Sequence, residues 1–338
     1  MKNFINIILF PLFLIYQLIV GIRNCLYDRN IFKSAKLPCK IISVGNITVG
    51  GTGKTPTVIA IAKFLRQQNK TVAVLSRGYG RKSSGTRLVT VDKTNKANWK
   101  NFGDEPTLMA KHLSDIPVVV DEKRTRGAEF LISQFNPEII ILDDGFQHRK
   151  LFRDVDIVLV NSNISKFSKR IFGFGNFRES WQSLRRAHLI FLTKSDYVSP
   201  SLKLRKKLTT FNLPIFISNI APASYLLDHN YNKIDGKHFN RKTAILFSGI
   251  GDPDSFNKTV QNFNIKIIDF IKFQDHRKYS KSDVDRIRNK FNKTGADILL
   301  TTEKDFLKIN SVDLPIYALP ISMNIEKEGY QHLLKLMN

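Results

Sequence analysis

The sequence predicts an α/β protein with a mostly parallel sheet and a second, smaller α/β lobe. Three observations support this fold class. Short apolar segments alternate with stretches of helical spacing, the pattern of strands joined by crossover helices. A glycine-rich segment follows the first apolar strand, and the strand–helix alternation resumes after residue 240. At 338 residues, the chain is long enough for two modest domains.

The composition narrows the class of protein. The chain has 53 Lys and Arg against 29 Asp and Glu, a formal net charge of +24. Such a charge attracts polyanions, whether nucleic acid, anionic lipid or phosphorylated substrates, and does not choose among them. The only cysteines, Cys25 and Cys39, are not in a CxxC or Cys/His pattern, which argues against a disulfide framework and a structural zinc site.

The N-terminal segment is uniformly apolar. Residues 4–21 carry no charge, and Arg23, Arg29, Lys33 and Lys36 follow them. Eighteen apolar residues are borderline for crossing a bilayer, and the basic flank favours the cytoplasmic side and anionic lipid. We expect a membrane anchor or interfacial helix with its basic flank in residues 1–36, spanning or lying on the membrane. A buried N-terminal helix is the alternative.

A glycine-rich loop follows the predicted strand 40–45 and precedes a predicted helix, 57–67. This order is typical of a P-loop, whose backbone N–H groups and helix N-terminus hold phosphate. Lys54 is expected to reach the β- and γ-phosphates of a nucleotide, and the Thr55 hydroxyl to bind Mg²⁺. A tight strand–helix turn that binds nothing is the alternative. The predicted nucleotide-binding residues are Thr48, which replaces the usual glycine, Val49, Gly50, Gly51, Thr52, Gly53, Lys54 and Thr55.

A second apolar run, 139–142, ends in Asp143 and Asp144. The carboxyl end of a parallel strand faces the ligand crevice, so Asp143 is expected to act on Mg²⁺. Neighbours on a strand point to opposite faces, so Asp144 is expected to have a different role. Gln147 and His148 lie in the turn that follows and are expected at the same site. A solvated turn is the alternative.

Further apolar strands complete the predicted domains. We place a P-loop domain at 37–200 and the smaller lobe at 201–338. The first domain is expected to contain strands at 72–75, 117–120, 155–160 and 189–192. The second is expected to contain strands at 243–249, 265–271 and 297–301, with a helix near 253–263.

Two polar segments are candidates for acid–base chemistry. Asp104 and Glu105 precede Pro106 at the start of a predicted helix, where a helix cap is the simpler explanation. Phosphoryl transfer to an alcohol, however, needs a carboxylate that orients or deprotonates the hydroxyl. His276, in the segment 275–279, is either a partner that tunes a carboxylate or a surface histidine.

These segments together resemble the tetraacyldisaccharide 4'-kinase family of lipid A biosynthesis, from the N-terminal apolar segment to near the C-terminus. The matching motifs are Ser43-Val-Gly-Asn46, Gly50-Gly-Thr-Gly-Lys-Thr-Pro56, Ser76-Arg-Gly-Tyr-Gly-Arg81, Gly103-Asp-Glu-Pro106, Leu142-Asp-Asp-Gly-Phe-Gln-His148, Phe177-Arg-Glu-Ser180 and Asp275-His276. The family shares the departure at Thr48. The resemblance implies an ATP- and Mg²⁺-dependent kinase that phosphorylates the 4'-hydroxyl of an acylated glucosamine disaccharide 1-phosphate.

The resemblance also implies roles for individual residues and a place in the cell. Asp104 would be the general base and His276 its partner from the second lobe, and Lys54 would stabilise the transferring phosphoryl group. The implied metal ligands are Thr55, Asp143 and Glu179. The implied site-lining residues are Asp144, Gln147 and His148, of which Asp144 is counted as catalytic. The implied partners are a glycolipid substrate and the cytoplasmic face of the inner membrane, without nucleic acid.

Two alternatives concern other parts of the chain. In residues 166–186 basic and aromatic side chains alternate, which suits a phosphorylated glycolipid, single-stranded nucleic acid or a mobile basic loop. The resemblance favours lipid. The segment 193–196, Thr-Lys-Ser-Asp, is similar to the guanine-reading motif of P-loop GTPases and metallochaperones. The Asp143 segment lacks the D-x-x-G that such proteins carry.

Overall fold

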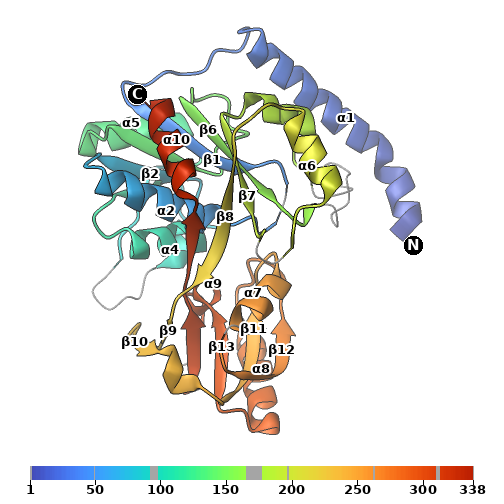
Figure 1. Cartoon of the computed structure of the whole chain (residues 1–338), viewed down its shortest axis with the longest axis vertical. Coiled ribbons are helices and arrows are strands. Elements are labelled where there is room, and N and C mark those ends of the chain that lie inside the picture. The colour runs from blue at the N-terminus through green and yellow to red at the C-terminus, as the bar shows by residue number, and fades with distance from the viewer. Residues whose placement is uncertain are drawn as a thin grey trace. The chain divides into compact units, whose positions relative to one another are not determined.

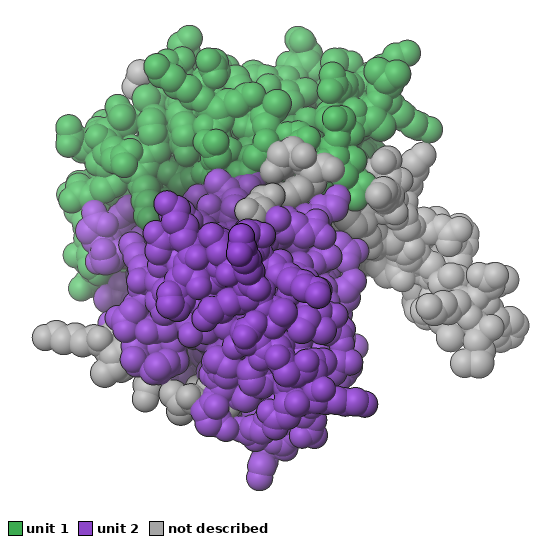
Figure 2. Space-filling model, turned by 60° about the horizontal axis from the view of Figure 1, so that its bottom comes forward, with its two compact units in different colours: residues 1–77, 121–219, 323–338 green, residues 78–120, 220–322 purple. Residues whose placement is uncertain are grey.

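The computed structural model describes residues 2–48, 50–91, 98–164, 177–195, 198–261, 263–309 and 313–337, with side chains from residue 15 onward. The chain forms two compact units (Figure 2). Unit 1 contains residues 1–77, 121–219 and 323–338, and unit 2 contains residues 78–120 and 220–322. Each unit is therefore assembled from separate stretches of chain. The predicted division at residues 36 and 200 used continuous ranges and stays a prediction about domains.

Unit 1 contains a parallel sheet whose strands follow the order β8-β7-β6-β1-β5-β2 (Figure 1). β15 borders β8 at the edge. The central strands are buried along their length and read as continuous apolar runs, as parallel strands covered on both faces do. The strands are β1 (Lys40–Asn46), β2 (Val72–Ser76), β5 (Ile139–Asp143), β6 (Val155–Asn161), β7 (Leu189–Thr193), β8 (Ile215–Pro222) and β15 (Ile321–Ile325).

The helices of unit 1 other than the N-terminal one each contain buried residues. In α2, side chains such as Val58, Ile61 and Leu65 are buried at the spacing of one helical face. Tyr330 of α10 stacks on Phe64 of α2, with ring centroids 4.2 Å apart. The helices are α1 (Lys2–Asp28), α2 (Lys54–Gln67), α5 (Arg124–Phe135), α6 (Leu202–Thr209) and α10 (Lys327–Met337), with a 3₁₀ turn, η2, at Trp181–Arg186.

The N-terminal segment forms one helix, α1, as predicted. Ile15, Leu18, Ile19 and Ile22 on this helix are each more than half exposed. Within the described part of the chain, no helix meets the length and hydropathy needed to cross a bilayer.

Unit 2 contains a sheet with the order β10-β9-β14-β13-β11-β12, in which β14, β13, β11 and β12 run parallel. The residues of unit 2, including two strands that are not part of this sheet (β3 and β4), form β3 (Arg87–Leu88), α3 (Trp99–Phe102), α4 (Asp104–His112), β4 (Val118–Val120), β9 (Tyr225–Leu227), β10 (Lys233–Asp235), the 3₁₀ turn η3 (Gly236–Phe239), β11 (Thr243–Ser248), α7 (Pro253–Val260), β12 (Lys266–Lys272), α8 (Lys281–Thr294), β13 (Ile298–Thr302), α9 (Glu303–Phe306) and β14 (Ile316–Leu319). The strands and helices predicted in the second half of the chain are confirmed, with ends shifted by up to three residues.

Two apolar cores cover the two faces of the unit 2 sheet. Along β11, Ala244 and Leu246 belong to one core, while Ile245 and Phe247 belong to the other. This alternation follows from the two-residue period of a strand. Both faces of the sheet are thus buried, so the loops at its carboxyl ends follow strands that are packed on both sides.

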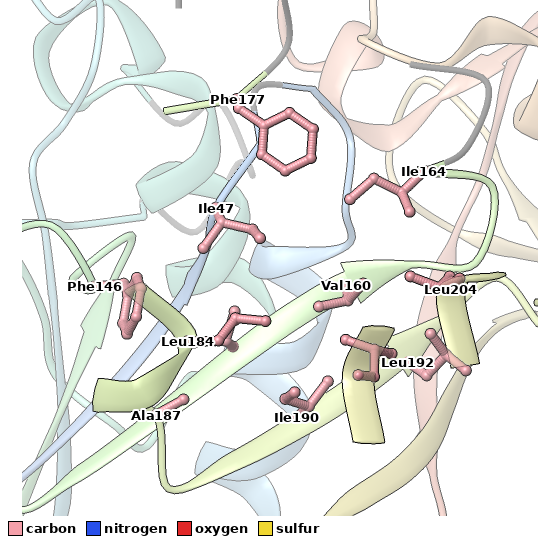
Figure 3. Close-up of a cluster of buried hydrophobic side chains, with 12 residues drawn as sticks. Ile47, Phe146, Val160, Ile164, Phe177, Leu184, Ala187, Ile190, Leu192 and Leu204 are labelled. Atoms are coloured by element: carbon pink, nitrogen blue, oxygen red, sulfur yellow. The ribbon is translucent and has the colours of Figure 1, made fainter. Parts of the chain in front are cut away.

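A cluster of buried apolar side chains in unit 1 anchors three loops at once (Figure 3). We call it the Phe146 cluster; its buried members are Ile47, Phe146, Val158, Val160, Ile164, Phe177, Leu184, Ala187, Ile190, Leu192, Leu204 and Leu208. Ile47 opens the glycine-rich loop, Phe146 follows the β5 carboxylates, and Phe177 precedes Arg178. Each is at most 2% exposed. Close packing here fixes the polar residues beside these three anchors.

Candidate active site

The carboxyl ends of β1, β2 and β5 meet at one edge of the unit 1 sheet. Val44 pairs with Asp143, and Leu75 pairs with Leu142, so Ser76 lies next to Asp143. The Ser76 hydroxyl donates a hydrogen bond to Asp143 Oδ2 at 2.8 Å. This register follows from parallel pairing, and it places a buried carboxylate at the end of β5 as predicted.

The glycine-rich loop leads into the N-terminus of α2. Gly53 caps this helix with φ 85°, a left-handed conformation that glycine adopts without steric cost. Gly53 has no side chain that could cap the helix, and the first turn of α2 contains no acidic residue. The Asn46 amide donates to Thr52 Oγ1 at 2.9 Å and ties the loop to β1. The positive end of the helix dipole is thus left for an anion from elsewhere.

Lys54 lies within a set of polar and charged residues that we call the Lys54 cluster: Asn46, Lys54, Asp143, Asp144 and Arg178. Lys54 Nζ is 3.5 Å from Asn46 Oδ1 and 3.7 Å from Asp144 Oδ1. Arg178 Nη1 donates to both oxygens of Asp144 at 2.6 Å. Burial raises the pKa of Asp144, but the charges of Lys54 and Arg178 outweigh burial and hold this pKa below its ordinary value.

The two neighbouring carboxylates therefore contact different partners, as expected, although Asp144 lies beyond the end of β5 and strand alternation is not the reason. Asp143 accepts from Ser76, whereas Asp144 pairs with Lys54 and Arg178. Asp144 also has a positive φ of 53°, which is unusual for a residue with a side chain and common at functional sites.

The predicted metal ligands do not all lie in similar surroundings. Thr55 is buried in the first turn of α2, and Asp143 is buried at the end of β5. Glu179, by contrast, has both oxygens in ion pairs, with Arg186 Nη2 at 2.6 Å and Arg23 Nη2 at 3.3 Å. No group of three or more His, Cys, Asp or Glu side chains that could hold a metal occurs among the residues that the structure describes.

The other predicted nucleotide-binding residues border the same loop. Thr48 is buried and forms an isolated bridge with Phe177, and Gly50 and Gly51 lie in the loop before α2, with Gly50 at φ 110°. Val49 lies outside the described residues. Gln147 donates through Nε2 to the Asn46 carbonyl at 3.0 Å.

His148 follows Gln147 in the turn after β5. Burial and the nearby Arg124 charge lower its pKa to about 4, so its imidazole is neutral at pH 7. It therefore brings no positive charge to this edge of the sheet.

Asp104 and His276 are in contact, and both belong to unit 2. His276 Nδ1 is 3.1 Å from Asp104 Oδ2, and the Asp104 side chain is only 7% exposed. Asp104 Oδ1 accepts from the Glu105 backbone N–H at 3.0 Å. The two residues were expected to come from different domains. Residues 78–120 instead group with 220–322, so the pair lies within one compact unit.

Two lysines complete what we call the Asp104 cluster: Asp104, Glu105, His276, Lys304 and Lys308. Lys308 Nζ lies 3.5 Å and Lys304 Nζ 3.9 Å from Asp104 Oδ2. Burial raises the pKa of Asp104, but the hydrogen bond from His276 and the two lysine charges hold it well below the ordinary 3.8. Asp104 is therefore ionised throughout the physiological pH range.

The backbone holds His276 in an unusual conformation. Its φ of 57° is left-handed, and its N–H donates to Gly249 O and to Asp275 Oδ1, each at 3.0 Å. The Tyr79 ring lies against the imidazole, with centroids 5.3 Å apart. Strained backbone of this kind persists where the surrounding contacts over-determine it.

Sequence reasoning missed several members of these clusters. Ser76 opens the Ser76–Arg81 motif, which was noted without a role, and Arg178 stands in the motif with Glu179. Lys304 and Lys308 are about two hundred residues from Asp104 in the chain, and only the fold brings them together. The sequence feature that could have drawn attention to Lys304 and Lys308 is the alternation of acidic and basic residues that follows β13.

Two predictions fall partly outside the described residues. The basic and aromatic segment includes residues 165–176, which are not described, and its described members begin at Phe177. Asp196 of the guanine-reading motif is also not described, whereas Thr193 and Lys194 are buried at the end of β7.

Comparison with known proteins gives a consistent result. The family model described as tetraacyldisaccharide-1-P 4'-kinase matches residues 5–338. The tetraacyldisaccharide 4'-kinase of Aquifex aeolicus (strain VF5) is 38% identical over 320 residues, covering 95% of both chains. That of Chlorobaculum tepidum is 38% identical over 309 residues, covering 90% of this chain and 86% of its own.

A solved structure resembles the whole chain. It is described as the "apo" form of LpxK from Aquifex aeolicus in complex with ATP, with a TM-score of 0.79 and 36% identity. The match covers 99% of this chain and 100% of that one. The predicted α/β fold of P-loop type and the suggested family are thereby confirmed. The chain belongs to the tetraacyldisaccharide-1-phosphate 4'-kinase family.

Proposed function

We propose that this protein transfers the γ-phosphate of ATP to the 4'-hydroxyl of tetraacyldisaccharide 1-phosphate, a step of lipid A biosynthesis. The observation that carries the proposal is family membership over residues 5–338, together with the uncapped α2 N-terminus beside Lys54. The relative solved with ATP supports the choice of nucleotide.

The Lys54 cluster supplies the groups that a nucleotide triphosphate needs. The N-terminus of α2 and the loop at Gly50–Gly53 offer backbone N–H groups to the phosphate oxygens. The Lys54 ammonium stabilises negative charge on the transferring phosphoryl group. Asp144 sits between Lys54 and Arg178, which holds both cations in place while no phosphate is bound.

The residues present suit Mg²⁺. This ion prefers oxygen ligands and keeps several waters and substrate phosphates, so it needs only one or two protein oxygens. Thr55 and Asp143 are such oxygens, and Ser76 orients the Asp143 carboxylate. When bound, the ion neutralises charge on the phosphates. We retain Glu179 as a predicted ligand, although its ion pairs with Arg23 and Arg186 favour a structural role.

Asp104 is proposed to accept a hydrogen bond from the attacking hydroxyl and to orient it. Its carboxylate is ionised and held at both oxygens, by His276 at one and the Glu105 N–H at the other. A positioned group of this kind contributes roughly 10²–10⁴-fold to a rate. His276 is proposed to hold the carboxylate in place.

The glycolipid substrate and the membrane surface are the proposed partners. Ile15, Leu18, Ile19 and Ile22 are exposed on α1, and Arg23 follows them. Exposed apolar residues beside basic ones suit the headgroup region of an anionic bilayer. We place the protein at the cytoplasmic face of the inner membrane.

The test is transfer of labelled γ-phosphate from ATP to lipid A disaccharide 1-phosphate in detergent micelles. We expect product from wild type, loss of about 10²-fold or more in Asp104→Asn, and comparable loss in Lys54→Ala. Asp115→Asn, at an exposed position of unit 2, is the matched control and should retain full activity.

Other outcomes would change the proposal. Full activity in Asp104→Asn would remove this residue from its role while keeping the kinase. Absence of product with wild type, combined with tighter binding of GTP than of ATP, would favour the P-loop GTPase alternative.

A further inference from the structure

Two lysines of unit 2 lie against the Asp104–His276 pair, and both come from the segment that follows β13. Lys304 belongs to α9, and Lys308 follows one turn later. Their side chains are 15% and 1% exposed. Burying an ammonium is costly unless it is paired, so such placement needs an explanation.

Lys304 lies at the far nitrogen of the imidazole. Its Nζ is 3.3 Å from His276 Nε2 and donates to Glu105 Oε1 at 3.0 Å. An ammonium has only hydrogens to offer, so Nε2 must present its lone pair to Lys304. In a neutral imidazole the hydrogen then lies on Nδ1, which donates it to Asp104.

A protonated His276 would have no lone pair for Lys304. It would also place two positive charges 3.3 Å apart. The pKa of Lys304 is raised, because Glu105, Asp104 and Asp275 outweigh the effect of burial. Lys304 therefore stays charged, and its hydrogens face Nε2 of the imidazole.

Lys308 presents a second charge to the same carboxylate oxygen. Its Nζ is 3.0 Å from Asp305 Oδ1 and 3.5 Å from Asp104 Oδ2. Asp305 is itself fixed, since its Oδ2 accepts from the Gly249 N–H at 2.9 Å and from the Thr302 hydroxyl at 2.8 Å. Lys308 is thus a charge that cannot turn away from Asp104.

We propose that Lys304 and Lys308 are positioning residues for phosphoryl transfer. Lys304 holds His276 in the tautomer with its hydrogen on Nδ1, and Lys308 holds the Asp104 oxygen in place to accept that hydrogen. The kinetic part rests on the proposed function, because it assumes that Asp104 and His276 act in the transfer. The tautomer part does not depend on any activity.

The charges around the pair fit this proposal. Glu105 and Asp275 face Lys304, and Asp305 faces Lys308. The Tyr79 ring covers another side of the imidazole. The carboxylates of Glu105, Asp275 and Asp305 balance the charge of the two lysines. Both ammonium groups can therefore lie beside Asp104 without an excess of positive charge.

The first experiment measures the tautomer of His276 by ¹⁵N NMR of the imidazole in the full-length protein, with the signal assigned from His276→Gln. We expect wild type to show a hydrogen on Nδ1 and none on Nε2 at pH 7. In Lys304→Met the donor to Nε2 is gone, so a hydrogen should also be detected on Nε2.

The NMR experiment has two control variants. Lys304→Arg keeps the positive charge and should retain the wild-type tautomer, and Lys278→Met, at an exposed position two residues after His276, should leave the spectrum unchanged. A wild-type hydrogen on Nε2, or an unchanged Nε2 signal in Lys304→Met, would overturn the role of Lys304.

The second experiment measures kcat/KM in micelles at pH 7. Lys304 and Lys308 hold the His276–Asp104 pair in one arrangement, so removing either lysine should lower kcat/KM by about tenfold or more. Lys304→Arg, which keeps the charge, should stay close to wild type.

The outcomes separate this proposal from the proposed function. Wild-type kcat/KM in both Lys304→Met and Lys308→Met would overturn the proposal. If Lys308→Met does not fold, Lys304→Met decides the kinetic test. If wild type transfers no phosphate at all, the proposed function fails, while the NMR result still decides the role of Lys304.

Discussion

Replacing Glu179 by Gln tests whether this buried carboxylate is part of the fold or a metal ligand. Its side chain is 1% exposed and pairs with Arg186, which is 14% exposed, at 2.6 Å. Removing one partner of a buried pair costs about 3 kcal/mol or more, because the other charge stays buried. Arg23 is 37% exposed, so its pair with Glu179 at 3.3 Å should add less than about 1 kcal/mol.

We therefore expect Glu179→Gln to lose about 3 kcal/mol of unfolding free energy in buffer free of metal and nucleotide. The assay is urea unfolding followed by circular dichroism and by the fluorescence of Trp181, which lies two residues away. In Glu122→Gln, where both partners of the pair with Arg126 are more than 40% exposed, the urea midpoint should stay within experimental error.

A double-mutant cycle sharpens this test. With Arg186→Met already present, Glu179→Gln should lower the unfolding free energy by at least about 1 kcal/mol less than it does alone. The reason is that the double variant has no Arg186 guanidinium that would stay buried without a partner. If Glu179→Gln unfolds like the control without metal, yet needs more Mg²⁺ for activity, the structural reasoning is refuted and the ligand role is favoured.

Two further predictions concern packing and pH. A Cβ on Gly45 would lie 2.6 Å from Phe146 Cβ, so Gly45→Ala should cost roughly 1–3 kcal/mol in urea unfolding. Gly21→Ala, which meets nothing within 4 Å, should cost nothing, and equal losses in the two variants would contradict the packing argument. Because the pKa of His148 is lowered to about 4 from 6.5, the folded state binds fewer protons than the unfolded state between these values, and stability falls as pH drops through this window. His148→Asn should lose less stability than wild type between pH 7 and pH 5, and an unchanged pH dependence would show that this imidazole is not the cause.

The parts of the fold that depend on local pattern could be predicted from the sequence. β1, β5 and α2 lie where the apolar runs and the glycine-rich loop placed them, because periodicity and turn chemistry act over a few residues. The family followed from the order of short motifs. Asp143 and Asp144 were expected to differ, and they contact different partners.

The parts that depend on long-range assembly could not be predicted. Nothing local shows that residues 78–120 join residues 220–322, which is why Asp104 was expected in a different domain from His276. Lys304 and Lys308 were missed for the same reason. The reading of Glu179 relied on a motif, and a motif does not reveal that two guanidinium groups already contact both oxygens.

The division of the chain also has a consequence for its synthesis. The chain passes between the units at residues 77/78, 120/121, 219/220 and 322/323, and its last segment returns to unit 1. There Tyr330 stacks on Phe64 of the helix that begins at Lys54. A ribosome delivers the chain from the N-terminus at about 5–20 residues per second, so unit 2 is complete before unit 1 has received its final helix. A nascent chain should therefore acquire its full affinity for nucleotide only after α10 has emerged from the ribosome, later than unit 2 is complete.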